Sequence, residues 1–204
     1  MHLLNPVILG IVILLLLAAL VIVKQVATGS VLEKPSGSPL LQAVNIFNLF
    51  FLLVVNPIAA VGLWTSALPA LDPTRFAVNA PWLLVAMESI GLLLYLAGFG
   101  LMAWALIALG SNYQLGGSAP RAKDEMITNG PYGLIRHPMY TAALSIALGL
   151  GLFTESAAFL LVFFIYLVLI LALIPREEGE LQKAYSSKYL EYRRKTSALL
   201  PSLY

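Results

Sequence analysis

The chain has 204 residues, of which 60% are hydrophobic and 11% charged, and its mean hydropathy is +0.88. Soluble globular domains carry about 25% charged residues, so this composition excludes a soluble enzyme and indicates an integral membrane protein. The absence of cysteine excludes disulfides, thiolate metal sites and a cysteine nucleophile. With His2 and His137 as the two histidines, no metal centre is expected, and the net charge of +2 does not point to a nucleic-acid partner.

The first three apolar segments are each long enough to cross about 30 Å of hydrocarbon as a helix. We predict the first over about Val7–Val23 and read it as a retained anchor rather than a signal peptide. The second, about Leu40–Leu63, carries Pro57, where a kink is expected because proline removes a backbone hydrogen bond. The third, about Trp82–Leu109, is long enough to tilt or to project from the bilayer.

Two further apolar segments predict a tight helical hairpin. The fourth, about Tyr140–Phe153, is short, and the fifth covers about Ala157–Ile174, with Thr154 or Ser156 as its N-cap. We therefore predict an all-α, polytopic transmembrane bundle of about five spans, forming a single integral membrane domain over residues 1–204. An amphipathic C-terminal helix follows the last span.

The basic residues indicate how the bundle is oriented. With five spans and an outward-facing N-terminus, all but Arg75 of the 12 Lys and Arg face the cytoplasm. Such asymmetry is the positive-inside signal. It predicts that the loop before the fourth span and the C-terminal tail share the cytoplasmic side.

A polar cluster, "TNGPYGLIRHPMY" at 128–140, opens the fourth span. Gly130 and Pro131 favour a turn, and Pro138 fits the first turn of a helix, where no amide donor is needed. The free amide groups of this helix start form an anion site, with Arg136 beside it. The tail brings Glu177 to the same membrane surface, facing Arg136, so the two suit a zwitterionic ligand.

Each of these residues also has a structural interpretation. Arg136 fits a positive-inside anchor, Tyr132 and Tyr140 fit an interfacial aromatic belt, and the tail fits a helix lying on the lipid surface. Glu88, inside the third span, is either a functional acid or a side chain that reaches water.

Three stretches together carry a resemblance to a known family. They are "LGSNYQ" at 109–114, "TNGPYGLIRHPMY" at 128–140 and "REEGELQKAYSSKYLEYRRKTSALLP" at 176–201. In this order they resemble the integral membrane methyltransferases, which include isoprenylcysteine carboxyl methyltransferases and phospholipid N-methyltransferases. The resemblance covers about residues 105–204, the expected methyltransferase core, whereas the helices within 1–80 carry no motif.

The resemblance implies an S-adenosylmethionine site at the cytoplasmic face, built without a Rossmann domain. Carried over by position, the cofactor-binding residues are Gln114, Asp124, Glu125, Met126, Ile127, Tyr132, Arg136, His137, Pro138, Met139, Tyr140 and Glu177. We expect the cofactor carboxylate at the helix start and Arg136, and its ammonium group at a carboxylate such as Glu177.

The expected acceptor is a lipid amine or another lipophilic nucleophile that partitions into the membrane. An amine or thiol must lose a proton, for which His137 or Glu178 is the candidate base. In the prenylcysteine enzymes an Arg that engages the substrate lies four residues before the tail glutamate, a position that Leu173 occupies here, and Arg176 is close. Isoprenylcysteine carboxyl methylation, with Arg176 at the substrate, is the alternative.

Two other classes share parts of this pattern. Membrane sterol reductases have a similar C-terminal bundle and use a nicotinamide cofactor, although they resemble much longer chains. The second class is a non-enzymatic membrane scaffold. This class does not explain why Glu177 and Arg136 would face each other.

The predicted topology can be tested by labelling because the chain contains no native cysteine. Single cysteines introduced at Ser118 and Ser202 should both react with an impermeant reagent from the cytoplasmic side only. Labelling of the two positions from opposite sides would contradict the five-span topology.

Overall fold

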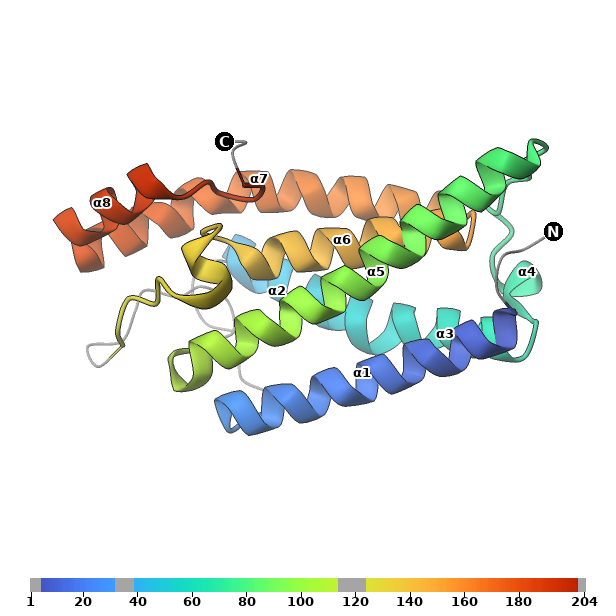
Figure 1. Cartoon of the computed structure of the whole chain (residues 1–204), viewed down its shortest axis with the longest axis horizontal. Coiled ribbons are helices and arrows are strands. Elements are labelled where there is room, and N and C mark those ends of the chain that lie inside the picture. The colour runs from blue at the N-terminus through green and yellow to red at the C-terminus, as the bar shows by residue number, and fades with distance from the viewer. Residues whose placement is uncertain (1–4, 32–38, 114–123, 202–204) are drawn as a thin grey trace.

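The computed structural model describes residues 5–31, 39–113 and 124–201, so Gln114, Ser118 and Ser202 lie outside the described residues. Throughout the described part every regular element is a helix (Figure 1). The elements are α1 (Pro6–Thr28), α2 (Pro39–Phe50), the π-helical turn η1 (Phe51–Val55), α3 (Asn56–Trp64), the short α4 (Leu68–Leu71), α5 (Pro81–Leu109), the 3₁₀ turns η2 (Gly110–Asn112) and η3 (Gly130–Gly133), α6 (Pro138–Phe153), α7 (Ala157–Tyr185) and α8 (Ser187–Lys195). The all-α prediction is confirmed.

Four helical segments are long and apolar enough to cross a membrane. They are α1, the α2–α3 segment, the α5 segment and α7. The fifth expected span, α6, has 16 residues and rises about 24 Å, so it is shorter than the hydrocarbon layer. The predicted short fourth helix is therefore present, and it accompanies the four candidate spans found among the described residues.

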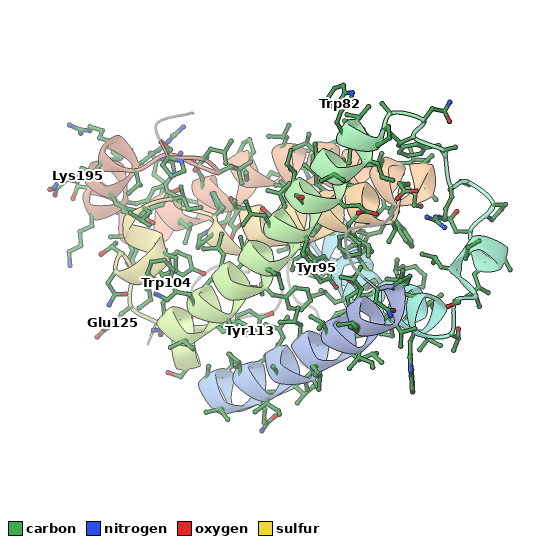
Figure 2. The ribbon with its side chains drawn as sticks, turned by 45° about the vertical axis from the view of Figure 1, so that its right-hand side comes forward. Trp82, Tyr95, Trp104, Tyr113, Glu125 and Lys195 are labelled. Atoms are coloured by element: carbon green, nitrogen blue, oxygen red, sulfur yellow. The ribbon has the colours of Figure 1, made fainter. Side chains whose placement is uncertain are left out.

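Large apolar side chains on the outer faces of the long helices match a lipid environment. On α5, Trp82 and Trp104 are 73% and 47% exposed and lie towards opposite ends of the helix (Figure 2). At 1.5 Å per residue they are about 33 Å apart along the axis, close to the thickness of the hydrocarbon layer. Interfacial aromatic side chains at this spacing fit a helix that spans the bilayer.

Helix α6 lies in the middle of the bundle, between α5 and α7 (Figure 1). It packs on α5 through small residues that let the two backbones approach closely. A Cβ at Gly149 would lie 2.5 Å from the Gly91 carbonyl oxygen and 2.7 Å from the Tyr95 amide nitrogen. This tight crossing fixes where α6 begins, and with it the polar cluster at residues 128–140.

The second span is distorted, as Pro57 led us to expect, but the distortion lies before this proline. Before Pro57 the chain forms the π-helical turn η1, and the carbonyl of Phe51 accepts hydrogen bonds from both the backbone and the side-chain amide of Asn56. The Tyr95 hydroxyl donates to Asn56 Oδ1 at 2.6 Å and locks this turn in the core. The span is thus distorted on the N-terminal side of Pro57, because the backbone there rearranges to satisfy its carbonyl groups.

The helix of the fifth predicted span continues beyond the predicted end of the span. Ser156 caps α7 by accepting from the Phe159 amide, as one of the two predicted caps, but α7 continues through Pro175 to Tyr185. The residues after Pro175 are mostly strong helix formers, so the loss of one hydrogen bond does not end the helix. The break comes at Ser186, whose φ of 51° reverses the chain into α8. The predicted tail helix is therefore the end of α7 followed by α8.

The α5–α6 crossing generates a matched pair of substitutions. Gly149→Ala, on α6, places a methyl group against the α5 backbone, whereas a Cβ at Gly100, on α5 itself, meets nothing within 4 Å. Overpacking typically costs about 1–3 kcal/mol, while an exposed helical Gly→Ala change stabilises by up to about 1 kcal/mol. We expect Gly149→Ala to lower the thermal unfolding temperature in detergent and Gly100→Ala to leave it unchanged or raise it. Equal melting of both variants would contradict this packing.

Candidate functional site

The turn η3 sets the entry of the chain into α6. Gly130 has φ 57°, and a Cβ there would lie 3.3 Å from Trp104 Nε1, so both the backbone angle and the space favour glycine. Pro131 and Tyr132 follow and are buried. The turn predicted for this motif is present, and α6 begins at Pro138 with no side-chain cap on its first turn.

The C-terminal tail lies against this helix start. The amide of Arg136 donates to the Ser197 carbonyl at 2.9 Å, and the amide of His137 donates to the Ala198 carbonyl at 3.0 Å. The Tyr192 hydroxyl donates to the Tyr132 carbonyl at 2.7 Å. Backbone and side-chain hydrogen bonds therefore fix α8 and the residues after it over the turn.

A buried ion cluster connects the tail to α6. Glu178 Oε1 lies 2.7 Å from Arg136 Nε and 3.3 Å from His137 Nε2, and Glu178 Oε2 lies 3.2 Å from Arg193 Nε. The side chains of Arg136 and Glu178 are each 7% exposed. The Arg136 guanidinium also donates to the carbonyls of Arg193 and Thr196. The expectation that Arg136 faces Glu177 is wrong: the adjacent glutamate, Glu178, is its partner.

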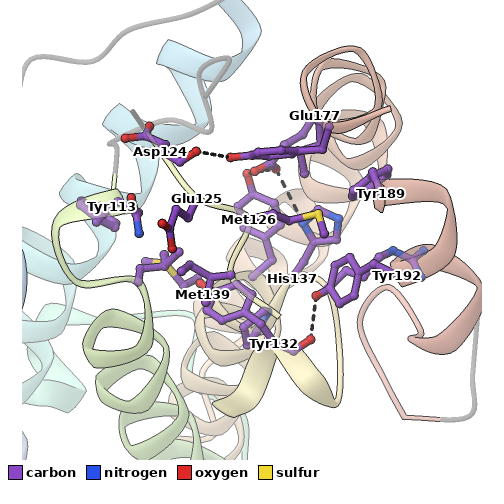
Figure 3. Close-up of a pocket in the computed structure, with 18 of the residues that line it drawn as sticks. Tyr113, Asp124, Glu125, Met126, Tyr132, His137, Met139, Glu177, Tyr189 and Tyr192 are labelled. Carbon is purple, nitrogen blue, oxygen red and sulfur yellow. Dashed lines mark hydrogen bonds and ion pairs between the residues drawn. The ribbon is translucent and has the colours of Figure 1, made fainter. Parts of the chain in front are cut away.

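Beside this cluster lies a partly open cavity of about 200 Å³, lined by helices and by the segment before α6 (Figure 3). Every predicted cofactor residue that the structure describes lines it, and Gln114 lies outside the described residues. These lining residues are Asp124, Glu125, Met126, Ile127, Tyr132, Arg136, His137, Pro138, Met139, Tyr140 and Glu177. Figure 3 shows Tyr113, Asp124 and Glu125 on one side and Glu177, Tyr189 and Tyr192 on the other.

Other lining residues were not assigned from the sequence. They are Asn45, Asn48, Leu109, Asn112, Tyr113, Leu181, Tyr185, Tyr189 and Tyr192. Most of them belong to the motifs at 109–114 and 176–201, where the tyrosines could have indicated a binding site. Asn45 and Asn48 come from α2, in the part of the chain that carries no motif. The one local signal that these two residues line a site was their spacing of three residues, which places two amides on one face of an apolar helix.

The described walls of the cavity carry more negative than positive charge. Asp124, Glu125 and Glu177 contribute carboxylates, whereas the Arg136 guanidinium is bound by Glu178. Glu177 Oε2 accepts from the Tyr140 hydroxyl at 2.8 Å and lies 3.7 Å from His137 Nδ1. Both ring nitrogens of His137 therefore face carboxylates. Such walls favour a ligand that carries positive charge.

The tyrosines of the cavity are neutral, flat and polar at one end. Burial raises the pKa of Tyr132, and the nearby charge of Glu177 raises it further. Burial also raises the pKa of Tyr192 to about 12. These side chains therefore stay protonated at physiological pH. The hydroxyl of Tyr189 and the Oδ1 of Asn48 are buried and have no hydrogen-bond partner among the described residues.

Three residues considered in the sequence lie away from this cavity. Arg176 is exposed, and Leu173 is packed in the core at 2% exposure. Glu88 is 7% exposed and lines a second cavity of about 180 Å³ at the opposite end of α6, beside Arg75 and Thr154. The candidate base Glu178 supports the cavity from behind without lining it.

Comparisons with known proteins match parts of the chain to a family and to two relatives. Residues 87–188, half of the chain, match the family model described as phospholipid methyltransferase. The cobalt-zinc-cadmium resistance protein CzcN of Cupriavidus metallidurans is 36% identical over 83 residues, which cover 41% of this chain and 38% of that protein. The nickel-cobalt-cadmium resistance protein NccN of Alcaligenes xylosoxydans xylosoxydans is 27% identical over 148 residues, which cover 70% of this chain and 65% of that protein. The chain thus spans less than two thirds of either relative.

A solved structure shares the fold. The eukaryotic intramembrane Ras methyltransferase ICMT, an isoprenylcysteine carboxyl methyltransferase, superimposes with a TM-score of 0.51 at 18% identity. The superposition covers 79% of this chain and 74% of that chain.

The ion cluster predicts a large difference between two neighbouring glutamates. Glu178→Gln leaves the buried Arg136 without its counter-charge, and breaking a buried pair typically costs about 3–5 kcal/mol. Glu180 pairs with Lys183 at an exposed surface site, where such pairs contribute about 0–1 kcal/mol. We expect Glu178→Gln to lower the melting temperature and to expose α8 to proteolysis, and Glu180→Gln to do neither. If α8 in the Glu178→Gln variant resists protease as well as it does in the wild type, the ion cluster does not anchor the tail.

Proposed function

This chain belongs to the phospholipid methyltransferase family, and from that premise we propose that it transfers a methyl group from S-adenosylmethionine to a lipophilic acceptor in the membrane. The observation that carries the proposal is the cavity at the start of α6, with its acidic and tyrosine-rich walls. The fold shared with ICMT supports the assignment of the bundle to membrane methyltransferases.

The residues of the cavity fit this cofactor chemically. S-adenosylmethionine carries a sulfonium cation, an α-ammonium group, a carboxylate and an adenine ring. Glu177, held by Tyr140, offers a carboxylate to the positive groups. The free amide groups expected at the start of α6 are largely occupied, because those of His137, Tyr140 and Thr141 donate to backbone carbonyls. The flat faces of Tyr132 and Tyr192 suit the adenine ring, and their low exposure suits a site that excludes water.

The same walls argue against a nicotinamide cofactor. NADPH carries several phosphate charges, which need free guanidinium or ammonium groups. In the described part of the cavity wall the one guanidinium, that of Arg136, is occupied by Glu178. Three carboxylates in the same wall would repel phosphate groups. A cationic cofactor therefore fits better than the anionic one of the sterol reductases.

When bound, S-adenosylmethionine supplies an electrophilic methyl group for in-line displacement by an acceptor atom. The protein's contribution is to position the two groups and to keep water out. Met126, Met139 and Leu181 supply apolar wall for this. Of the two bases considered, His137 lines the cavity and Glu178 does not, so His137 is the group placed to take a proton from an amine.

The position of the cavity favours an acceptor that arrives through the lipid. The cavity wall formed by α2 carries Ile46 and Phe50 on its outer side, 59% and 53% exposed. Leu173 is buried, and Arg176 is exposed and does not line the cavity, so neither position places a guanidinium at the cavity wall. An amine or another lipophilic nucleophile is therefore the proposed acceptor, and isoprenylcysteine carboxyl methylation is the alternative.

Calorimetry with S-adenosylhomocysteine tests the cofactor site in detergent-purified protein. Glu177→Gln and His137→Ala should each weaken binding about ten- to a hundredfold, because each removes a charge-assisted contact or its support. The control is Glu180→Gln, a surface glutamate three residues along the same helix, which should bind as wild type. NADPH should give no heat of binding. If both site variants bind S-adenosylhomocysteine as tightly as the wild type, the cofactor does not bind at this site. Binding of NADPH without binding of S-adenosylhomocysteine would favour the reductase class.

A further inference from the structure

The chain after α8 continues over residues 196–201 without forming a helix, and we call this segment the tail strap. It returns from the end of α8 towards the middle of α7, and so runs back along the bundle (Figure 1). Ala198 is fully buried and Leu199 packs against a core cluster, whereas Leu200 is 50% exposed. The tail strap therefore lies against the protein on one side and presents an apolar side chain on the other.

Three successive backbone carbonyls of the tail strap are bound by the segment that opens α6. Those of Ser197 and Ala198 accept hydrogen bonds from the two amides just before α6. The Leu199 carbonyl accepts from the Thr141 hydroxyl at 2.7 Å. Non-helical backbone is tolerated at membrane depth only where the protein satisfies its polar groups. The tail strap meets this condition at these three carbonyls, and the residue that ends it, Pro201, has no amide hydrogen to satisfy.

The hydrogen bond from Thr141 indicates how deep the tail strap lies. The next residue of α6, Ala142, packs on α5, since a Cβ at Gly98 would be 2.9 Å from the Ala142 carbonyl oxygen. Gly98 lies six residues, or about 9 Å along the axis of α5, further into the bundle than the interfacial Trp104. The Leu199 carbonyl is bound one residue from this contact. The end of the tail strap is therefore level with Trp104 or inside it, where the membrane interface begins.

The order of residues along the tail suits such a position. Arg194 and Lys195 are exposed at the end of α8, and the apolar pair Leu199 and Leu200 follows within the tail strap. Long basic side chains at a membrane surface keep their charged ends among water and lipid head groups, whereas leucine side chains favour the acyl chains. A change from basic to apolar residues is therefore expected where a segment enters the interface from the water side.

We propose that the tail strap inserts into the membrane interface at the end of the bundle that holds the cavity, with Leu200 among the lipid acyl chains. The strap also binds the amides of Arg136 and His137, which line the cavity. Without these residues the strap carbonyls would lie unsatisfied near the lipid, and without the strap the two amides would lose their partners. The membrane interface and the cavity wall are therefore joined through the backbone of this segment.

Spin labelling tests the insertion directly, because the chain has no native cysteine. Leu200→Cys, Lys195→Cys and Val168→Cys are each labelled with a nitroxide and reconstituted into bilayers of dioleoyl phosphatidylcholine. The Lys195 side chain, 69% exposed on α8, is the water control, and Val168, 66% exposed on α7, is the lipid control. All three side chains are exposed, so the labels do not replace core packing. Collisions of each nitroxide with oxygen, which concentrates in lipid, and with a water-soluble nickel chelate are measured by electron paramagnetic resonance.

We expect the ratio of oxygen to nickel collisions at residue 200 to be higher than at residue 195 and to approach that at residue 168. The reason is that the nickel chelate is excluded from the acyl chains, whereas oxygen is not. A ratio at residue 200 no higher than that at residue 195 overturns the insertion.

The bond to the Leu199 carbonyl tests the link between the tail strap and α6. Thr141→Val removes the hydroxyl but keeps a side chain of similar shape, whereas Thr141→Ser keeps the hydroxyl. In the spin-labelled Leu200→Cys protein, Thr141→Val should lower the oxygen-to-nickel ratio, because the strap loses one of its bonds, and Thr141→Ser should preserve it. Equal ratios in the two variants would overturn the link. None of these measurements involves the cofactor, so the outcome is independent of the proposed methyltransferase function.

Discussion

The architecture of the site depends on one buried carboxylate. Glu178, on α7, binds Arg136 and His137 before α6 and Arg193 on α8, and so joins three segments that are far apart in the sequence. Without this cluster the tail hydrogen bonds to the start of α6 would have to hold α8 alone. The cluster also places Glu177, one residue earlier, at the cavity wall. A single ion cluster therefore supports the cavity and orients one of its charged groups.

Local sequence signals were sufficient to predict most of the fold. Apolar runs, proline positions and the cap at Ser156 predicted the helices to within a few residues, because these signals act over one or two turns. The extension of α7 beyond Pro175 was missed because the end of an apolar run marks the edge of the lipid rather than the end of a helix. The π-helical turn was missed because it depends on Asn56 and Tyr95, which meet only in the folded bundle.

The site shows the same division between local and tertiary information. The motif positions correctly indicated residues that gather at one cavity, since a motif records which residues act together. The partner of Arg136 was predicted as Glu177 and is Glu178, and these neighbours differ by about 100° around the helix. Such a rotation follows from how α7 packs on α6, which no single segment encodes. Asn48 was overlooked for a similar reason: the sequence does not tell which side of α2 faces lipid.

The unbroken course of α7 links the site to the mechanics of the bilayer. Its apolar part lies among lipid chains, and its last part, Pro175–Tyr185, extends about 16 Å further as the same rod. Helices adjust their tilt when membrane thickness changes. A change in the tilt of α7 would displace Glu177 and Tyr185 near its C-terminal end. The ion pair between Glu178 and Arg136 would oppose this displacement relative to α6. A change in the tilt of α7 would therefore act on the cavity as well as on the part of the helix that lies in the membrane.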